Sequence, residues 1–466
     1  MRELNLQLNQ GPQPLYLRLA ESIRHAIEAG QVQPGELLPS TRQLAQRCHA
    51  HRHTVMNALG ELVAEGWLEA EPARGYRVVA GLPRYFSQER VGQSAPTVHK
   101  NQHRYAFPSG QPELRLFPTQ EYYGILREVL RQTDPTALLD YGDPYGCPEF
   151  LLQLGIYLRR MRDLSSSQIV VTHGSQEGIF LVARHLVQPG QQVAVEELGY
   201  SPAWEAIQLV GGKLVGLPVD TQGLQPDALE KLARRGPVAL LYVTPLHQYP
   251  TTVTMALERR RQLYEVAARH RIPILEDDYD HEFHYRSRPL APLKSRDPEQ
   301  LVYYISTFSK VVYPSARLGF VVPPEGQGQA LARLKSVTSR HCNSLLQLAQ
   351  ARWMESGGFE RHLRRMRRLY QGRLQAMEQA LRCSGQVEFQ SPDGGMSLWV
   401  NFFVDSQLLS SAAARVGVAV RPGNDYHLHQ KPGTHLRLGF ASSNEQEIEQ
   451  GIGLLLESAK TLPRRT

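Results

Sequence analysis

Long apolar runs are missing from this chain of 466 residues. It contains no stretch of about 18 consecutive apolar residues, so we expect no segment to span a membrane. The first ten residues lack the apolar core of a secretion signal, and we therefore expect a cytoplasmic protein. Only four cysteines occur, and they are too far apart in sequence to form a metal-binding motif (Cys48, Cys147, Cys342, Cys383). We expect isolated thiols and no metal site.

Lysine is also scarce: only eight of the 52 basic residues are lysines. One of them, Lys310, ends the segment Ser306-Thr307-Phe308-Ser309-Lys310. An acidic segment that includes Asp277 lies upstream, and Arg317 lies downstream. A lysine amine can hold an aldehyde as a Schiff base. Pyridoxal 5′-phosphate (PLP) suits this setting, because its ring nitrogen pairs with a carboxylate and its phosphate with hydroxyls and a guanidinium. A solvated loop lysine is the alternative interpretation.

The length suggests two or three domains, and the first 80 residues have the pattern of a small separate one. Apolar spacing predicts a helix that ends near Gly30, a short helix that opens at Ser40 or Thr41, and a third over 52–65. Alternation over 67–70 and 75–79 predicts a hairpin. Helices joined by a tight turn and followed by a hairpin are typical of a winged helix-turn-helix.

Residues 12–80 closely resemble the GntR-type DNA-binding domain. The matching segments are Pro14-Leu15-Tyr16, Pro34-Gly35-Glu36-Leu37-Leu38-Pro39-Ser40-Thr41-Arg42-Gln43-Leu44-Ala45, Arg52-His53-Thr54-Val55 and Leu62-Val63-Ala64-Glu65-Gly66-Trp67-Leu68. The chain departs from the family at His49-Ala50-His51, where the family usually has Gly-Val-Ser. A helical protein-interaction module is the alternative.

The resemblance implies that this module binds double-stranded DNA. Arginines contact guanine edges or phosphates, and hydroxyls and helix N-termini hold phosphates. We expect the DNA-binding residues to be Ser40, Thr41, Arg42, Arg52 and Thr54 on the helices and Arg74, Gly75 and Tyr76 on the wing. Residues 1–80 contain eight arginines and eight glutamates, so binding must depend on a local basic face.

Residues 81–104 have no sustained period and are predicted to be a linker. From 105 to 466, strand-like runs alternate with helical stretches, which predicts an α/β core. The expected strands are 168–171, 192–195, 238–243, 273–275, 301–305 and 319–322, and expected helices include 178–186 and 257–269.

Motifs along residues 105–466 resemble a fold-type I PLP enzyme, the aspartate-aminotransferase fold. They include Thr172-His173-Gly174-Ser175-Gln176-Glu177-Gly178, Thr244-Pro245-Leu246-His247-Gln248-Tyr249-Pro250-Thr251-Thr252, Ile274-Leu275-Glu276-Asp277-Asp278-Tyr279-Asp280 and His435-Leu436-Arg437-Leu438-Gly439-Phe440. The resemblance implies a mixed sheet with flanking helices and a smaller C-terminal α+β subdomain.

The resemblance also implies a role for each matching residue. Ser175, Gln176, Thr307, Ser309 and Arg317 would hold the phosphate, with the first two at a helix N-terminus, which binds anions. Tyr200 would lie against the pyridine face, Asp277 would pair with the ring nitrogen, and His247 and Tyr279 would approach the phenolic oxygen. Arg437 would grip the α-carboxylate of a bound amino acid.

A GntR-like head, a linker and an aminotransferase-like body together resemble the MocR/GabR-type transcription regulators over nearly the whole chain. The resemblance implies a head-to-tail homodimer on an operator with two half-sites, and an amine, an amino acid or PLP itself as effector. The alternative is a working aminotransferase with an accessory DNA-binding domain. The basic run at 361–368 is predicted to be a solvated helix, with a second DNA contact as a further hypothesis.

Overall fold

The computed structural model describes residues 6, 13–80, 104–108, 110–166, 168–285 and 290–465. The chain divides into two compact units, Met1–Lys100 and Asn101–Thr466. The linker predicted at 81–104 lies outside the described residues except for Arg104.

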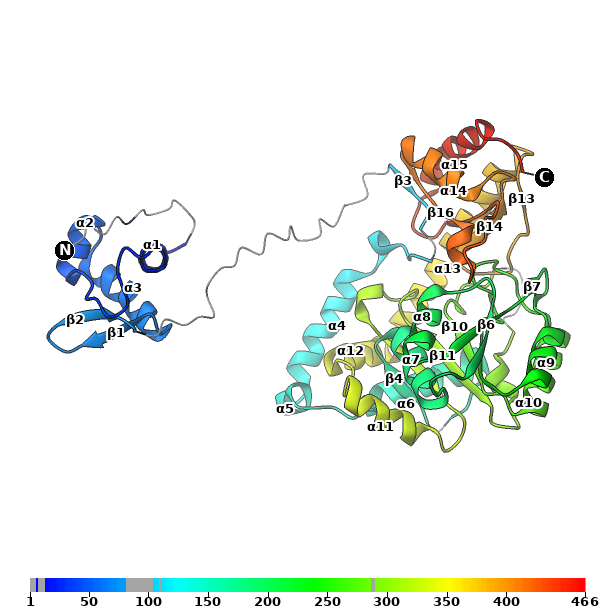
Figure 1. The fold of residues 1–466 in the computed structure, drawn as a ribbon. Helices are drawn as coiled ribbons and strands as arrows, with labels where there is room; N and C mark the ends of the chain where they lie inside the picture. The colour runs from blue at the N-terminus through cyan, green and yellow to red at the C-terminus, as the bar shows by residue number, and fades with distance from the viewer. Residues whose placement is uncertain are drawn as a thin grey trace. The chain divides into compact units, whose positions relative to one another are not determined.

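The first unit is a three-helix fold with a β-hairpin (Figure 1). Its elements are α1 (Leu15–Glu28), α2 (Thr41–Arg47), α3 (Arg52–Ala64), β1 (Leu68–Glu71) and β2 (Gly75–Val78). The apolar face predicted for α1 is buried against α2, α3 and the hairpin in one hydrophobic cluster. Leu37 forms an additional bridge with Arg77 of β2. The predicted winged helix-turn-helix is therefore confirmed.

The second unit is built on a seven-stranded mixed sheet. In spatial order its strands are β4 (Val170–Thr172), β12 (Gly319–Val322), β11 (Val302–Thr307), β10 (Ile274–Asp278), β9 (Val238–Val243), β5 (Gln192–Glu196) and β6 (Lys213–Leu217). Only β12 runs antiparallel to its neighbours. The central strands are buried and largely apolar, as expected for a sheet covered by helices on both sides.

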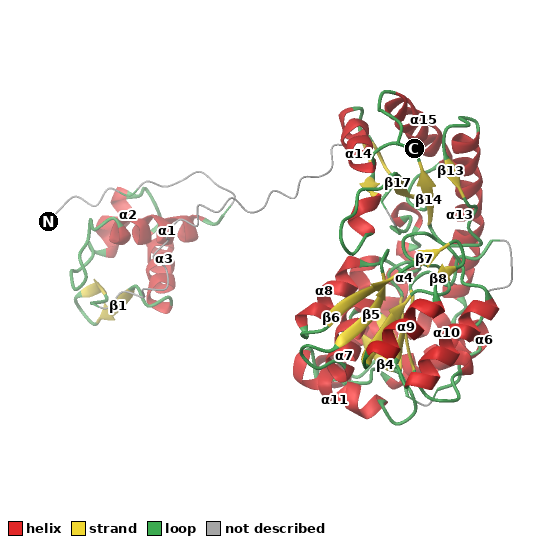
Figure 2. Cartoon of the chain, turned by 45° about the vertical axis from the view of Figure 1, so that its right-hand side comes forward, coloured by secondary structure: helices red, strands yellow, loops and turns green. Residues whose placement is uncertain are grey.

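Helices cover both faces of this sheet (Figure 2). One face packs on α7 (Gly174–Leu186) and α8 (Ser201–Leu209), and the other packs in part on α9 (Pro226–Arg235) and α10 (Leu257–His270). The remaining helices of this part are α4 (Thr119–Gln132), α5 (Pro135–Leu139), α6 (Pro148–Arg162), α11 (Gly328–Thr338) and α12 (Ser344–Glu355). A two-stranded ladder joins β7 (Val219–Asp220) and β8 (Gly223–Leu224).

A smaller sheet forms the C-terminal subdomain, which is the α+β part predicted from the sequence. Its strands are β13 (Glu388–Phe389), β14 (Ser397–Asn401), β17 (His435–Gly439) and β16 (Arg421–Pro422), and its helices are α13 (Gly358–Arg382), α14 (Ser406–Arg415) and α15 (Glu445–Lys460). The strand β3 (Tyr105–Ala106) pairs with β15 (Val418–Ala419), so the start of this unit is tied to its C-terminal part.

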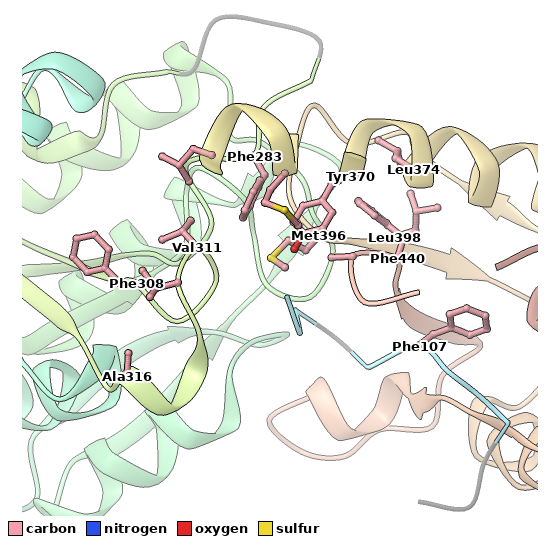
Figure 3. Packing of buried hydrophobic residues seen from close by; sticks show 14 of the residues in the cluster. Phe107, Phe283, Phe308, Val311, Ala316, Tyr370, Leu374, Met396, Leu398 and Phe440 are labelled. Atoms are coloured by element: carbon pink, nitrogen blue, oxygen red, sulfur yellow. The ribbon is translucent and has the colours of Figure 1, made fainter. Parts of the chain in front are cut away.

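One hydrophobic cluster connects the turn after β11 with the small sheet (Figure 3). Phe308 and Val311 come from that turn, Leu398 and Phe440 from the C-terminal subdomain, and Tyr370 from α13. All five are at most 2% exposed. Burying a side chain of this size contributes about 1.5–3 kcal/mol, so the turn is firmly held. Lys310 lies between Phe308 and Val311 in this turn, so the cluster holds its backbone in place.

Candidate cofactor site and DNA-binding surface

The candidate cofactor residues follow different strands of the large sheet. Strands β5, β9, β10 and β11 are parallel. Tyr200 follows β5, Asp277 stands near the end of β10, and Lys310 follows β11. Because the carboxyl ends of parallel strands meet at one edge, these residues gather there, which is where ligands bind in open α/β sheets.

Asp277 has a buried oxygen that lacks a partner. The hydroxyl of Tyr242 donates to Asp277 Oδ2 at 2.7 Å. Within the described residues, Asp277 Oδ1 is buried without a hydrogen bond. Burial raises the pKa of Asp277 to about 7, although the Tyr242 hydrogen bond opposes the shift. A buried acceptor of this kind fits the protonated ring nitrogen of PLP.

Lys310 lies where its amine is partly desolvated. Burial lowers its pKa, Arg437 lowers it further, and Asp280 and Asp277 act in the opposite direction. A lowered pKa leaves more of the amine unprotonated and able to attack an aldehyde. Gly110, which the sequence did not single out, faces this amine: a Cβ built on it would lie 3.3 Å from Lys310 Nζ. Glycine therefore keeps room beside the reactive nitrogen.

Arg437 is buried in an aromatic surround. Its carbon Cζ lies 4.1 Å from the ring centroid of Tyr249, and Nη2 donates to the Tyr279 hydroxyl at 3.2 Å. Tyr249 also makes edge contacts with Tyr200 and Tyr426, each at 5.5 Å between centroids. Burial alone would lower the pKa of Arg437, but the surrounding tyrosines outweigh it and the net shift is upward. Tyr249 and Tyr426 are functional candidates that the sequence reasoning missed.

Two residues of the His-Gln-Tyr-Pro segment, His247 and Gln248, are buried and hydrogen-bonded. His247 Nδ1 is 2.6 Å from Asp280 Oδ1, and both side chains are buried. The Gln248 side chain donates to the Leu198 and Tyr249 carbonyls and so closes the turn. Tyr249 is the residue that packs against Tyr279, at 5.7 Å between centroids. The signal that could have singled out Tyr249 was its position directly before Pro250 in this matching segment.

Thr252 lies in the same turn and has a backbone conformation that is unusual for a residue with a side chain. It adopts a φ of 66°, in the left-handed region that glycine favours. Its N–H donates to the Gln248 carbonyl at 2.7 Å. The turn thus keeps the backbone geometry of a glycine without having one.

The expected phosphate residues gather around the N-terminus of α7. Arg317 Nη2 donates to the His173 carbonyl at 2.7 Å, and a Cβ on Gly174 would lie 2.9 Å from this nitrogen. Ser309 and Thr307 are joined by a hydroxyl hydrogen bond of 2.9 Å. Free N–H groups at a helix N-terminus, hydroxyls and a guanidinium form an anion site.

Ser175 and Gln176 occupy the first turn of α7. The Gln176 side chain donates to the Pro202 carbonyl at 2.7 Å, so it contacts the start of α8. Its backbone N–H remains at the helix N-terminus, as the sequence predicted. These positions, the orphan Asp277 oxygen and the space beside Lys310 together fit PLP.

The first unit presents the expected DNA-binding residues at two helix starts. Ser40 caps α2 in a reciprocal capping box with Gln43. Arg42 is exposed in the first turn of α2, and Arg52, also exposed, opens α3 and donates to Thr41 Oγ1 at 3.3 Å. Thr54 is half-buried in the first turn of α3. The structure therefore brings the beginnings of α2 and α3 together.

The departure at His49-Ala50-His51 leaves this turn geometry intact. His49 adopts a φ of 48°, the conformation that the family glycine would take. His51 caps α3 by accepting the His53 N–H at 3.3 Å, which is the role of the family serine. The two histidines thus replace a glycine and a capping hydroxyl.

The hairpin tip carries the expected wing residues. Arg74 is exposed, Gly75 has a φ of 117°, and Tyr76 is half-buried. Arg77 is held by Glu71 and by the Gly35 carbonyl, so Arg74 is the wing arginine that faces solvent.

The basic run at 361–368 lies on α13. Three of its arginines contact other segments of the second unit. Arg361 is 3.3 Å from Glu121, and Arg367 Nε donates to the Glu282 carbonyl at 2.9 Å. Arg365 donates to the Leu116 carbonyl. The helix is less freely solvated than the sequence suggested, and a DNA contact at this run stays a prediction.

No helix among the described residues is both long enough and apolar enough to cross a membrane.

Two family profiles match the chain. The profile of class I and II aminotransferases covers residues 120–455, and that of bacterial regulatory proteins of the gntR family covers 15–78. The chain is 32% identical to the probable rhizopine catabolism regulatory protein MocR of Rhizobium meliloti, over 97% of this chain and 96% of that protein. It is 27% identical to the pyridoxine biosynthesis transcriptional regulator PdxR of Corynebacterium glutamicum, over 96% and 97%.

The second unit also resembles solved aminotransferases. A crystal structure of Pyrococcus horikoshii kynurenine aminotransferase, in complex with PMP, aligns with a TM-score of 0.73 and 29% identity. The alignment covers 78% of this chain and 92% of the enzyme. A gntR-type head and a class I and II aminotransferase body are thus joined in one chain, as they are in full-length regulators. The chain belongs to the MocR-type transcription regulators of the GntR superfamily, whose body is a PLP-dependent aminotransferase domain.

Proposed function

We propose that this regulator binds PLP through Lys310 and changes its binding to DNA when an amine or amino acid reaches the same site. The observation that carries the proposal is the meeting of Lys310, the partnerless Asp277 oxygen and buried Arg437 in a chain with a gntR-type head. When bound, PLP supplies an aldehyde that condenses with amines and a ring that withdraws electrons.

Each protein group has a distinct part in this proposal. Asp277 would accept a hydrogen bond from the protonated ring nitrogen. Lys310, with its lowered pKa, would offer an amine to the aldehyde. The α7 N-terminus and Arg317 hold the phosphate. Arg437, oriented by Tyr249 and Tyr279, holds the carboxylate of the effector.

The DNA side of the proposal concerns the exposed arginines of the first unit. Arg42 and Arg52 at two helix starts, with Thr54, contact a major groove, and Arg74 contacts the neighbouring backbone. We propose a head-to-tail homodimer that engages two half-sites and acts in the cytoplasm. An effector shifts DNA binding only if it favours one conformation of the body over another.

Two alternatives use the same residues. Relatives of the second unit include working aminotransferases, so turnover of an amino acid is the second candidate function. PLP itself could also be the effector, in which case Arg437 would have no carboxylate to bind.

The experiment is an absorbance titration of the PLP-loaded protein with amino acids and amines, run in parallel with fluorescence anisotropy on DNA that the protein selects from a random pool. The proposal expects one compound to change both the cofactor spectrum and DNA affinity at the same concentration. Conversion of the cofactor to its amine form, with recovery on adding a keto acid, would indicate an aminotransferase. A response of DNA binding to PLP alone would indicate a cofactor sensor.

Lys310→Ala provides the test of attachment, with the surface variant Lys213→Ala as its control. Lys310→Ala should abolish the covalent absorbance band and the effector response while DNA binding persists. If Lys310→Ala loses all DNA binding although its circular dichroism is unchanged, Lys310 is mainly structural and the proposal fails.

A further inference from the structure

Three potential metal ligands meet beside the phosphate end of the site. They are His173, Glu177 and Cys342, and their ligand atoms all lie within 4.8 Å of one another. The sequence gave no reason to expect a metal site, because Cys342 is 165 positions from Glu177 and belongs to no local motif. We propose that these three side chains, named here the His-Glu-Cys cluster, bind one divalent cation of the zinc type.

Two ligands come from one helix start. His173 directly precedes α7 and Glu177 stands one turn later, so their side chains lie on the same face. His173 Nδ1 is 3.1 Å from Glu177 Oε2. Ligands at about 2.0–2.3 Å from a tetrahedral zinc ion are separated by roughly 3–4 Å, so small side-chain shifts would bring all three into range.

The third ligand selects the kind of cation. Cys342 lies just before α12 and is 1% exposed. A thiolate, an imidazole and a carboxylate are ligands that zinc accepts together, whereas calcium and magnesium require oxygen ligands. Three protein ligands leave a fourth position for water.

A cation can reach the His-Glu-Cys cluster from solvent, and hydrogen bonds orient the ligands of the cluster. The His173 side chain is 38% exposed and that of Glu177 14%, so a cation can enter from the His173 side. The Ser339 hydroxyl donates to Glu177 Oε1, and the His173 N–H donates to Glu177 Oε2 at 2.6 Å. Such outer hydrogen bonds orient the ligands of metal sites.

The cluster also borders the phosphate residues without belonging to them. The carbonyl of His173 accepts the hydrogen bond from Arg317 Nη2, whereas its imidazole faces Glu177. A cation bound to the imidazole would hold the start of α7 and the start of α12 together. The proposed site therefore lies beside the residues expected to hold the phosphate, and its cation would link two helix starts.

The test uses full-length, PLP-loaded protein without a purification tag. The protein is stripped with a chelator, loaded with zinc, dialysed and measured by elemental analysis, and it is titrated separately with cobalt(II). We expect one zinc per chain and a thiolate-to-cobalt charge-transfer band in the near ultraviolet. Cys342→Ser and Glu177→Gln should each weaken zinc binding at least tenfold.

Cys383→Ser is the matched control, because Cys383 is an exposed thiol outside the cluster. It should bind zinc as the wild type does. Failure of the wild type to retain zinc, unchanged binding by Cys342→Ser, or loss of binding in Cys383→Ser would overturn the proposal. If Cys342→Ser does not fold, the cobalt spectrum of the wild type decides: without a thiolate band, the proposal is wrong.

Discussion

Arg437 of β17 lies over the ring of Tyr249, with its guanidinium carbon 4.1 Å from the ring centroid. The two residues come from different parts of the second unit: Arg437 from a strand of the small C-terminal sheet and Tyr249 from the loop that follows β9 of the large sheet. Their contact closes one end of the candidate site, because the same guanidinium also reaches the Tyr279 hydroxyl. A cation over an aromatic face is stabilised by about 0.5–2 kcal/mol.

Arg437→Gln should remove the response to amino acids and spare the response to amines without a carboxylate. Losing a hydrogen-bonded charge partner costs about 1.5–3 kcal/mol, so apparent amino-acid affinity should fall roughly 10- to 150-fold. The measurement is the absorbance titration of the PLP-loaded variant with both kinds of compound.

Arg421→Gln is the control for that variant. Arg421 stands opposite Arg437 in the neighbouring strand β16, but its side chain is largely exposed. The Arg421→Gln variant should respond to amines and to amino acids as the wild type does. An equal loss of amine and amino-acid responses in Arg437→Gln would mean that Arg437 supports the fold rather than the effector.

Gly110→Ala should weaken PLP binding. The added methyl would lie 3.3 Å from Lys310 Nζ, and the φ of 67° at this position strains any residue with a Cβ. The lysine must then shift, and the rate of covalent PLP binding should fall. Gly124→Ala in α4 is the matched control, since a Cβ there meets nothing within 4 Å. Equal rates of covalent PLP binding in Gly110→Ala and Gly124→Ala would show that PLP binding does not depend on the space beside the Lys310 amine.

Much of this arrangement could be predicted because its signals are local. The strands at 238–243 and 319–322 agree with β9 and β12 to the residue, since short apolar runs next to turn-forming residues such as Pro237 and Pro323 are typical of buried strands. Asp277, at the end of such a run, had to lie at a strand end. Fold class and the two-part organisation followed from these patterns.

The missed residues depend on contacts between distant segments. Tyr249 and Arg437 are 188 positions apart, and no periodicity indicates that they meet. Gly110 stands outside every motif, and its importance depends on a backbone angle and on the position of Lys310. Likewise, the left-handed His49 shows that a turn can keep its shape without the glycine that sequence reasoning looks for.

Asp277→Asn should change the pH dependence of stability in cofactor-free protein. The pKa of Asp277 is raised to about 7 in the folded state, from an ordinary value of 3.8, so its contribution to stability is complete below pH 4 and is lost as the pH rises through about 7. A difference of one in pKa between the folded and unfolded states corresponds to about 1.4 kcal/mol of folding free energy. Relative to the wild type, the variant should therefore gain resistance to urea as the pH rises from about 4 to about 7.

Asp163→Asn, at an exposed helix end, serves as the control and should show no such gain. Both proteins are followed by urea unfolding at several pH values after PLP has been removed. A difference between Asp277→Asn and the wild type that does not vary with pH would contradict the assignment of a raised pKa to this carboxyl.

Arg52→Gln should weaken DNA binding and reduce its salt dependence. Arg52 is exposed at the start of α3, and a side chain that neutralises one phosphate contributes about 0.9 to the slope of log affinity against log salt. The slope should therefore fall by about one. The measurement is fluorescence anisotropy with one duplex at several salt concentrations.

Arg24→Gln is the control in the same unit, because Arg24 is already paired with Glu65 at 2.7 Å and belongs to α1. It should leave the slope unchanged, since it has no phosphate partner to lose. If Arg52→Gln lowers affinity for a selected duplex but keeps the slope, Arg52 reads a base edge instead, and specificity at that base pair should relax by about 1–3 kcal/mol. If neither affinity nor slope changes, the start of α3 does not face DNA.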